Sequence, residues 1–200
     1  MIGIIDYDAG NLQSVCNALN YLGINSKIVK TALELECCEK LILPGVGAFP
    51  AAVESLKSKG LFDEIRIQAK KKPIFGICLG MQLLFSKSYE FGECEGLGLV
   101  PGSVVPINSC GFKIPHMGWN ELVINFKCEL IKNLNSDRFV YFVHSFRAEC
   151  DYKYVSCFSE YSEKIPAIIR NGNIYGAQFH PEKSSYTGLS ILKSFSEVKN

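Results

Sequence analysis

The amino-acid sequence predicts an α/β protein with a mostly parallel central sheet, helices on both faces of that sheet, and a smaller β-rich portion. Two observations lead to this fold class. In the first half of the chain, short apolar runs alternate with segments of helical spacing, which is typical of parallel sheets covered on both faces. Beyond residue 92 the pattern changes to shorter runs separated by turns. No repeat or linker divides the 200 residues, so we expect one domain over 1–200.

The expected elements of the first half follow one another regularly. The apolar run 1–7 is predicted to form a strand. Apolar residues at helical spacing then begin at Leu12, and the helix that they predict is expected to stop near Gly23. The remaining expectations are strands at 24–29 and 41–43, amphipathic helices at 49–59 and 61–71, and a buried strand at 74–77. Sites in such sheets gather at the carboxyl ends of the strands. The glycine-rich loop 44–47 and the turn after 74–77 are therefore expected to face one another.

The second half is predicted to be rich in β-structure. The candidate strands are 104–107, 121–124, 139–143, 154–158 and, near the C-terminus, 174–179. The segment 113–120 contains Trp119, the only tryptophan. Two interpretations of this residue stay open: it fills a gap in the core or covers a loop, or it lies at a binding surface, where aromatic residues are enriched.

Charge and composition exclude several classes of partner and ligand. A formal net charge of +1 gives no electrostatic reason to expect binding to nucleic acid or to a membrane surface. No apolar run is long enough to span a bilayer, and Asp6 interrupts the first one, so no signal peptide is expected. The nine cysteines include no C-x-x-C pair, which favours reduced thiols in the cytoplasm. The three histidines are far apart in the sequence, so no metal site is expected. No cofactor is expected either.

The stretch 73–84 carries the strongest chemical signal. A short apolar run turns at Cys78 into helical spacing that includes Phe85, and glycines stand two residues to either side, at Gly76 and Gly80. This is the pattern of a nucleophile elbow with cysteine in place of serine. Such a turn strains the central residue, and side chains at the flanks would collide with neighbouring elements. The sulfur is thereby placed at a helix N-terminus, which favours a thiolate. The alternative is a small buried hydrophobic residue, as most free cysteines are.

A second chemical signal follows the last predicted strand. His180 comes directly after it, and Pro181 restricts the backbone there, so the imidazole is held rigidly. Glu182 is close enough in sequence to hydrogen-bond one ring nitrogen and leave the other for a thiol. A base within reach and a carboxylate that orients it are what a cysteine nucleophile needs. We therefore predict a triad of Cys78, His180 and Glu182. The alternative is a satisfied core histidine beside a surface carboxylate.

Two further histidines are weaker candidates for the base. His144 lies at the end of a probable strand and could lie near the site, but it has no carboxylate within a few residues. We interpret it as a lining or structural residue. His116 is a weaker candidate still.

These motifs together resemble the class I glutamine amidotransferases, whose fold is flavodoxin-like. The resemblance is carried by Gly76-Ile-Cys78-Leu-Gly80-Met-Gln82 and by Gln-Phe-His180-Pro-Glu182-Lys-Ser. Four more stretches contribute, namely 6–11, 44–47, 115–120 and 141–145. It spans nearly the whole chain. Residues 115–120 narrow it to the glutaminase subunits of imidazole glycerol phosphate synthases.

The resemblance implies a role for each matching residue. Cys78 would attack the side-chain amide of glutamine, His180 would act as general base and acid, and Glu182 would hold His180 in place. The same matching assigns the oxyanion hole to Val46, Gly47 and Leu79, substrate contacts to Gly45, Gln82, His144 and Ser145, and the interface or ammonia passage to Asn11, Trp119, Tyr141 and Lys183. In this family the loop 44–47 needs a peptide rotation before its N–H points inward. The free subunit is therefore expected to be a poor glutaminase.

The resemblance also implies a partner. This would be a cyclase subunit of (β/α)8 fold, forming a heterodimer, which uses the ammonia to make imidazole glycerol phosphate and an aminoimidazole carboxamide ribonucleotide in histidine biosynthesis. Asp8, Pro106 and Phe146 depart from the commoner family pattern, and related glutaminases feed ammonia to synthases that amidinate surface sugars. That pathway is one alternative. A non-catalytic interaction module that has kept the elbow is another.

Overall fold

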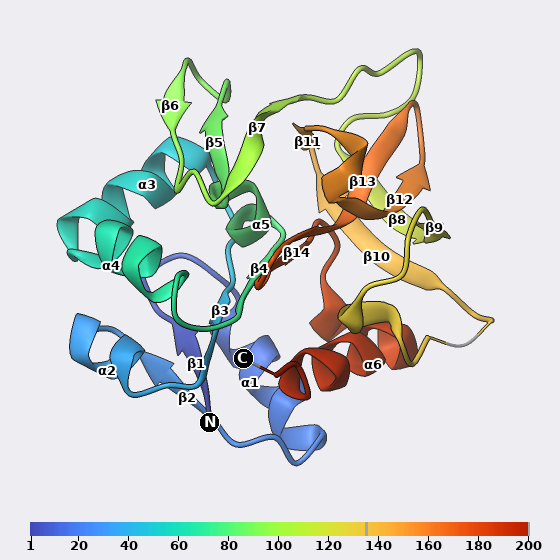
Figure 1. Ribbon diagram of the computed structural model, residues 1–200. Helices are drawn as coiled ribbons and strands as arrows, with labels where there is room; N and C mark the ends of the chain where they lie inside the picture. The colour runs from blue at the N-terminus through green and yellow to red at the C-terminus, as the bar shows by residue number, and fades with distance from the viewer. Residues whose placement is uncertain (135, 200) are drawn as a thin grey trace.

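Eight strands form a sheet through the middle of the computed structural model, which describes residues 1–134 and 136–199 (Figure 1). From edge to edge they are β2 (Ser26–Val29), β1 (Ile2–Ile5), β3 (Lys40–Leu43), β4 (Ile74–Ile77), β14 (Ile174–Ala177), β13 (Lys164–Asn171), β12 (Val155–Glu160) and β9 (Val123–Ile124). The first five run parallel, and each of the last three pairs antiparallel with its neighbour. The predicted mostly parallel sheet is confirmed.

Helices cover both faces of the parallel part (Figure 1). They are α1 (Leu12–Tyr21), α2 (Ala32–Glu36), α3 (Phe49–Ser58), α4 (Leu61–Gln68), α5 (Leu79–Leu83) and α6 (Ser185–Ser196). Successive residues of a strand point to opposite faces. In β1, Ile5 therefore packs in the apolar cluster of α3 and α4, whereas Ile4 packs in the cluster of α1 and α6. Within 1–134 and 136–199, none of these helices combines the length and the apolar character needed to cross a bilayer.

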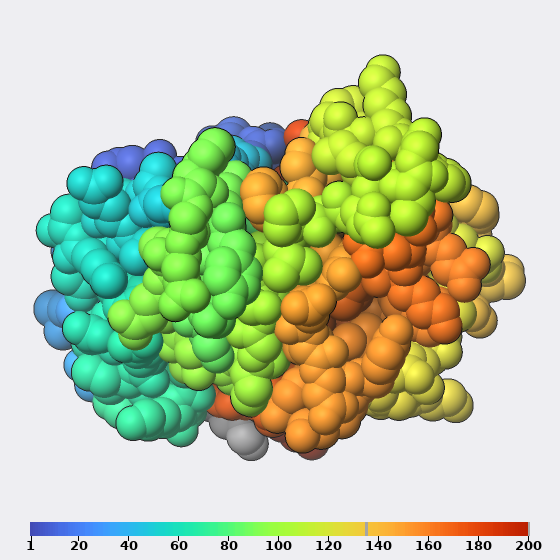
Figure 2. Space-filling model, turned by 90° about the horizontal axis from the view of Figure 1, so that it is seen from above, coloured from blue at the N-terminus to red at the C-terminus, as the bar shows by residue number. Residues whose placement is uncertain are grey.

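Two smaller sheets form the predicted β-rich portion. One has the order β11 (Phe146–Glu149), β7 (Val100–Pro106), β5 (Phe85–Ser88), β6 (Cys94–Glu95), and the other pairs β10 (Phe139–His144) with β8 (His116–Glu121). The exposed segment between β7 and β8 projects from the surface in Figure 2, where it is yellow-green. These sheets flank the carboxyl end of β4, where the predicted nucleophile lies.

Two sequence predictions in this region are wrong. Phe85 does not continue a helix, because α5 ends at Leu83 and Phe85 opens β5. Residues 121–124 do not form one strand, because β8 ends at Glu121 and the following two-residue strand β9 pairs with β12 in the large sheet. The buried Leu122 lies between the two strands. In both places the chain changes sheets, which a local apolar pattern does not report.

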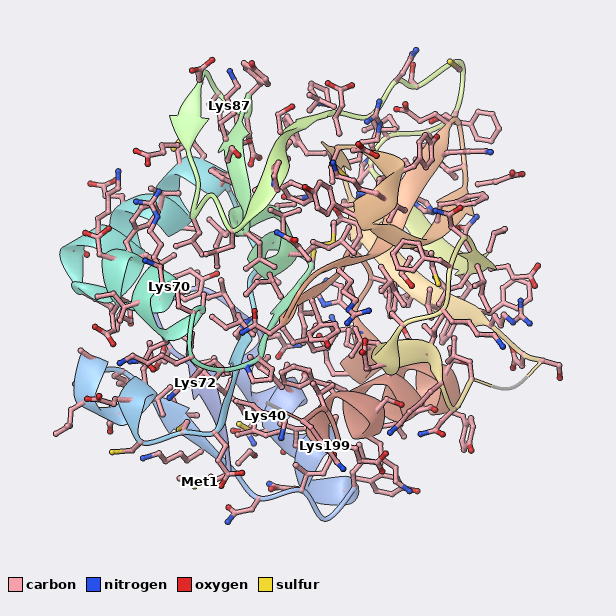
Figure 3. All side chains as sticks on the ribbon, in the orientation of Figure 1. Met1, Lys40, Lys70, Lys72, Lys87 and Lys199 are labelled. Carbon is pink, nitrogen blue, oxygen red and sulfur yellow. The ribbon has the colours of Figure 1, made fainter. Side chains whose placement is uncertain are left out.

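Helix α2 is not among the predicted elements, although its start signal is present in the sequence. Thr31 and Glu34 form a reciprocal capping box, with Thr31 Oγ1 accepting from the Glu34 N–H at 3.3 Å and Glu34 Oε2 accepting from the Thr31 N–H at 3.0 Å. At the other end, the Lys72 ammonium donates to three backbone carbonyls at 2.5–3.0 Å. Figure 3 labels Lys72 and Lys40 at the end of the sheet where the strands β4 and β3 begin. The predicted site lies at the opposite end, where these strands finish.

Candidate active site

Cys78 lies at a sharp turn between β4 and α5, with a φ of 54° and a ψ of −112°. A positive φ strains any residue other than glycine and persists only where the surroundings hold it. The flanking glycines are required by packing. A Cβ on Gly76 would lie 2.5 Å from the carbonyl oxygen of Gly80, and a Cβ on Gly80 would overlap the carbonyl oxygen of Leu43. The steric reason predicted for the Gly-x-Cys-x-Gly pattern is confirmed.

His180 and Glu182 form a hydrogen-bonded pair next to Cys78. The Nδ1 of His180 lies 2.8 Å from Oε1 of Glu182, and both side chains are almost completely buried. Because the Nδ1–H of His180 donates to the carboxylate, Nε2 is left to face the thiol. Burial acts to lower the pKa of His180, but hydrogen bonds with the side chains of Cys78 and Glu182 outweigh it and raise this pKa to about 10. The pair is thus arranged to hold a proton beside the sulfur.

One pocket of about 350 Å³ opens onto the sulfur and the imidazole. Its lining consists of Val46, Gly47, Cys78, Leu79, Gln82, Glu90, Pro115, Val143, His144, Ser145, Phe146 and His180. These residues come from the loop 44–47, the elbow, β10 and the start of β11, and the end of β14. A volume of this order suits a small-molecule ligand.

The loop 44–47 packs directly on the elbow, as the sequence predicts. A Cβ on Gly45 would come within 2.6 Å of the Tyr7 hydroxyl and 2.8 Å of a backbone nitrogen in α5, so only glycine permits this approach. The fully buried Tyr7 also donates its hydroxyl to the carbonyl oxygen of the first loop residue at 2.8 Å. Val46 and Gly47 line the pocket, whereas Gly45 is buried and does not.

His144, which lines the pocket, is paired with the buried His116. The Nδ1 of His144 is 2.8 Å from the carbonyl oxygen of Phe146, and its Nε2 is 3.0 Å from Nδ1 of His116. A backbone carbonyl can only accept, so His144 carries a proton on Nδ1. Both nitrogens of His144 are therefore occupied, and burial lowers its pKa to about 3, despite the hydrogen bond to Phe146. The His116 ring stacks on Phe142 and Tyr161, with ring centroids 4.7 and 4.1 Å away.

Acidification should destabilise the fold through His144. The unfolded chain takes up the imidazole proton near pH 6.5, whereas the folded chain resists it down to about pH 3, so stability falls as the pH drops below 6.5. Between pH 6.5 and 5 this residue should cost about 2 kcal/mol of unfolding free energy. Urea unfolding at pH 7 and pH 5 measures the loss. The variant His144→Asn, which keeps a donor near the Phe146 carbonyl, should lose about 2 kcal/mol less over that interval; equal losses would show that His144 titrates normally.

A family model described as Glutamine amidotransferase class-I matches residues 3–197. The match includes the elbow, the loop 44–47, His180 and Glu182. The chain belongs to the class-I glutamine amidotransferase family.

Relatives of this amidotransferase match it over nearly their full lengths. The imidazole glycerol phosphate synthase subunit HisH of Listeria monocytogenes serotype 4a (strain HCC23) is 49% identical over 200 residues, which cover 99% of this chain and 96% of that protein. The subunit of the same name from Carboxydothermus hydrogenoformans is 50% identical over 200 residues, which cover 99% of this chain and 100% of that protein. The resemblance to the subunits of this synthase, predicted from the motifs, is confirmed.

Solved structures show the same fold at lower sequence identity. A crystal structure of a glutamine amidotransferase aligns with a TM-score of 0.75 at 22% identity, over 98% of this chain and 99% of that one. The structure of PurLQS from Thermotoga maritima aligns with a TM-score of 0.77 at 21% identity, over 97% and 96% of the two chains. The amidotransferase fold predicted from the sequence is thereby confirmed.

The structure separates the remaining predicted residues of this amidotransferase into two groups. Those assigned to the substrate or the oxyanion hole line the pocket, apart from Gly45. Of those assigned to the interface, Trp119 is half exposed, and its ring centroid lies 6.0 Å from that of Tyr141 on the paired strand. The interpretation of Trp119 as a core residue is therefore wrong. Asn11 precedes α1 without a side-chain capping bond, and Lys183 is exposed in a short 3-10 turn, Pro181–Lys183.

Three residues around the pocket are absent from the sequence predictions. Gln178 lies two residues before His180 at the end of a buried strand, and alternation along that strand could have identified it. Tyr7, at the end of the first strand, had a similar positional signal. Glu90 had none: it lines the pocket and accepts the backbone N–H of Phe49, at the start of α3, at 2.8 Å. Its place depends on how the smaller sheet folds over the elbow.

Proposed function

We propose that this amidotransferase hydrolyses the side-chain amide of glutamine and delivers the ammonia to the cyclase subunit of an imidazole glycerol phosphate synthase, in histidine biosynthesis. The observation that carries the proposal is that Cys78 and His180 line one pocket, with Glu182 hydrogen-bonded to the Nδ1 of His180. A thiol, a base and a carboxylate that orients the base form the arrangement that amide hydrolysis requires. Identity of about 50% over the full chain to subunits of that synthase supports the pathway.

The chemistry proceeds in two stages. The Cys78 sulfur attacks the amide carbon of glutamine, and the His180 imidazolium gives its proton to the departing nitrogen as the carbon–nitrogen bond breaks. Ammonia leaves and a glutamyl thioester remains on Cys78. His180, now neutral, takes a proton from a water molecule that attacks the thioester, and glutamate is released as the carbon–sulfur bond breaks. Glu182 holds the ring orientation throughout and stabilises its charged form.

Charge on the tetrahedral intermediate requires donors on the pocket wall. The backbone N–H of Leu79, the residue after the nucleophile, is one donor that an elbow supplies. The second comes from Val46 or Gly47, which line the same pocket. Gln82, His144 and Ser145 complete the substrate contacts, and Gly45 acts by letting the loop approach the elbow. Gly47 has a φ of 104°, a conformation that suits a loop able to rotate a peptide.

The partner is proposed to be a cyclase subunit of (β/α)8 fold that docks over the pocket as a heterodimer in the cytoplasm. A docked partner keeps ammonia from water, where it would become ammonium and lose its nucleophilicity. The exposed Trp119, whose ring packs edge-to-face against the partly buried Tyr141, offers aromatic surface of the kind found in protein interfaces. Asn11 and Lys183 are proposed to extend this contact, and the chain acts as one amidotransferase domain over 1–200.

Glutamate release tests the proposal. The purified chain is assayed with glutamine alone, with a cyclase subunit, and with the cyclase subunit and its nucleotide ligand. Glutamate should stay near background in the first assay and rise in the last, and asparagine should not replace glutamine. Activation by a sugar-amidinating synthase instead would reassign the pathway and keep the glutaminase. No glutamate in any combination would favour a non-catalytic interaction module.

A further inference from the structure

Gln178 is a buried glutamine beside the nucleophile that the two-stage chemistry does not use. Its side chain is completely inaccessible, although it follows β14 directly. Burying an amide group is unfavourable unless its donors and acceptor are hydrogen-bonded. A leucine or methionine would fill the same space without that cost. The contacts of Gln178 should therefore reveal what the amide does there.

The orientation of the Gln178 amide follows from a chain of hydrogen bonds. The Gln82 amide lies 2.9 Å from the carbonyl oxygen of Phe146, which can only accept, so the group facing it is the Nε2 of Gln82. This same nitrogen lies 3.0 Å from the Gln178 amide. A nitrogen that only donates must face an oxygen, so Gln178 presents Oε1 to Gln82. Its own Nε2 is thereby left to face the other side, towards Cys78.

The Nε2 of Gln178 lies 3.9 Å from the Cys78 sulfur, within the range of a hydrogen bond to sulfur. An N–H donor aimed at a sulfur favours the thiolate over the neutral thiol, because it stabilises only the charged form strongly. The carbonyl oxygen of Val143, 4.0 Å from the sulfur, acts in the opposite sense, since it can accept only from a protonated thiol. His180 completes the polar surroundings of the sulfur. Gln178 is thus the neutral donor that offsets the carbonyl.

We propose that Gln178 is a positioning residue for glutamine hydrolysis: its amide N–H holds the Cys78 sulfur as a thiolate aimed into the pocket. Gln82, which lines the pocket, fixes the direction of that amide through its own Nε2. The inference rests on the proposed role of Cys78 as the nucleophile. It assigns to Gln178 no contact with the substrate, because the side chain does not line the pocket.

The pH dependence of Cys78 alkylation tests this assignment in the full chain. Iodoacetamide reacts with the thiolate, and peptide mass spectrometry separates Cys78 from the other eight of the nine cysteines. The variant Gln178→Met keeps the volume and removes the donor, and should move the alkylation midpoint up by about one pH unit. Gln178→Glu keeps the shape and turns a carboxylate oxygen towards the sulfur, and should move it further up. With the partner present, kcat for glutamate release should fall about tenfold in Gln178→Met, with KM little changed.

A matched control is available in α4. Gln68 is also a buried glutamine, and its amide donates to Glu64 at 2.6 Å rather than to a sulfur. Gln68→Met should leave the Cys78 midpoint where it is. If Gln178→Met and Gln178→Glu both fold and alkylate with the wild-type midpoint, Gln178 only fills space and the assignment is wrong; if one variant does not fold, the other decides.

The alkylation assay and the turnover assay separate two kinds of failure. A shifted midpoint in a protein that releases no glutamate with any partner would refute the proposed function and leave the contact between Gln178 and the sulfur standing. Normal turnover in the wild type, with an unshifted midpoint in the variants, would refute the role of Gln178 alone.

Discussion

Replacing Cys78 by serine should lower glutamate release by roughly 10³-fold or more, although the elbow keeps its shape. Sulfur can lose its proton to His180 before the attack begins, whereas a serine hydroxyl is a far weaker acid and must be deprotonated during the attack. The arrangement of His180 and Glu182 suits the first situation, because it stabilises an imidazolium beside a thiolate. The change is measured as kcat with the partner and its ligand present.

The same substitution should also lower the pKa of His180. Burial acts to lower this pKa, and the contributions that raise it to about 10 come from Cys78 first and then from Glu182. Serine removes the hydrogen bond between the His180 ring and the Cys78 sulfur and leaves the one with Glu182. The wild-type ring therefore keeps its proton up to about pH 10 and should lose it at a clearly lower pH in Cys78→Ser. An NMR titration can follow this, since the chain has three histidines.

A second buried cysteine supplies the control for both measurements. Cys128 lies at the start of a 3-10 turn, Glu129–Ile131, where serine is a favourable capping residue. Cys128→Ser should leave kcat and the His180 titration unchanged. Cys78→Ser activity within tenfold of the wild type would point to another nucleophile.

The elbow and the parallel strands could be predicted because local sequence determines them. The strand β4 is buried on both faces and therefore appears as an uninterrupted apolar run, with the bounds expected from the sequence. Gly76 is required by the carbonyl oxygen of Gly80, four residues further along the chain. The pairing of His180 with Glu182 is equally local, because two residues separate them. Short-range constraints of this kind leave a clear pattern in the sequence.

The remaining features depend on contacts that no local pattern encodes. Gln178 contacts Gln82 and Cys78, which are 96 and 100 residues away in the chain. A glutamine after an apolar strand gives no sign of such partners. The break at Leu122 between two sheets, and the place of Glu90 over the pocket, arise in the same way from the packing of the smaller sheets. The sequence therefore predicts Cys78, His180 and Glu182, which the structure brings together, but not the other residues that surround the sulfur.

Replacing Gly80 by alanine should destabilise the fold by at least about 3 kcal/mol and reduce glutamate release in the protein that remains folded. Helix propensity alone would favour alanine at this position of α5 by about 1 kcal/mol. Packing opposes it, since the new Cβ would overlap the carbonyl oxygen of Leu43 and lie 2.7 Å from its carbonyl carbon. These are backbone atoms of β3, which no rotamer change can move aside. Relief requires that α5 shift away from β3, and such a shift carries the elbow and the loop 44–47 with it.

Comparing the urea unfolding of Gly80→Ala with that of Gly23→Ala separates the effect of the overlap with Leu43 from the effect of ordinary backbone strain. Gly23 has a φ of 70°, and a Cβ there would meet nothing within 4 Å, so Gly23→Ala should cost only about 1–2 kcal/mol from its left-handed conformation. A smaller loss of unfolding free energy for Gly80→Ala than for Gly23→Ala would show that β3 can move to make room for the new Cβ at little cost. In that case the packing of the loop 44–47 on the elbow would add little to stability. The strained backbone of Cys78 would then be held mainly by β14, because the Cys78 N–H donates to the Ala177 carbonyl oxygen at 2.7 Å.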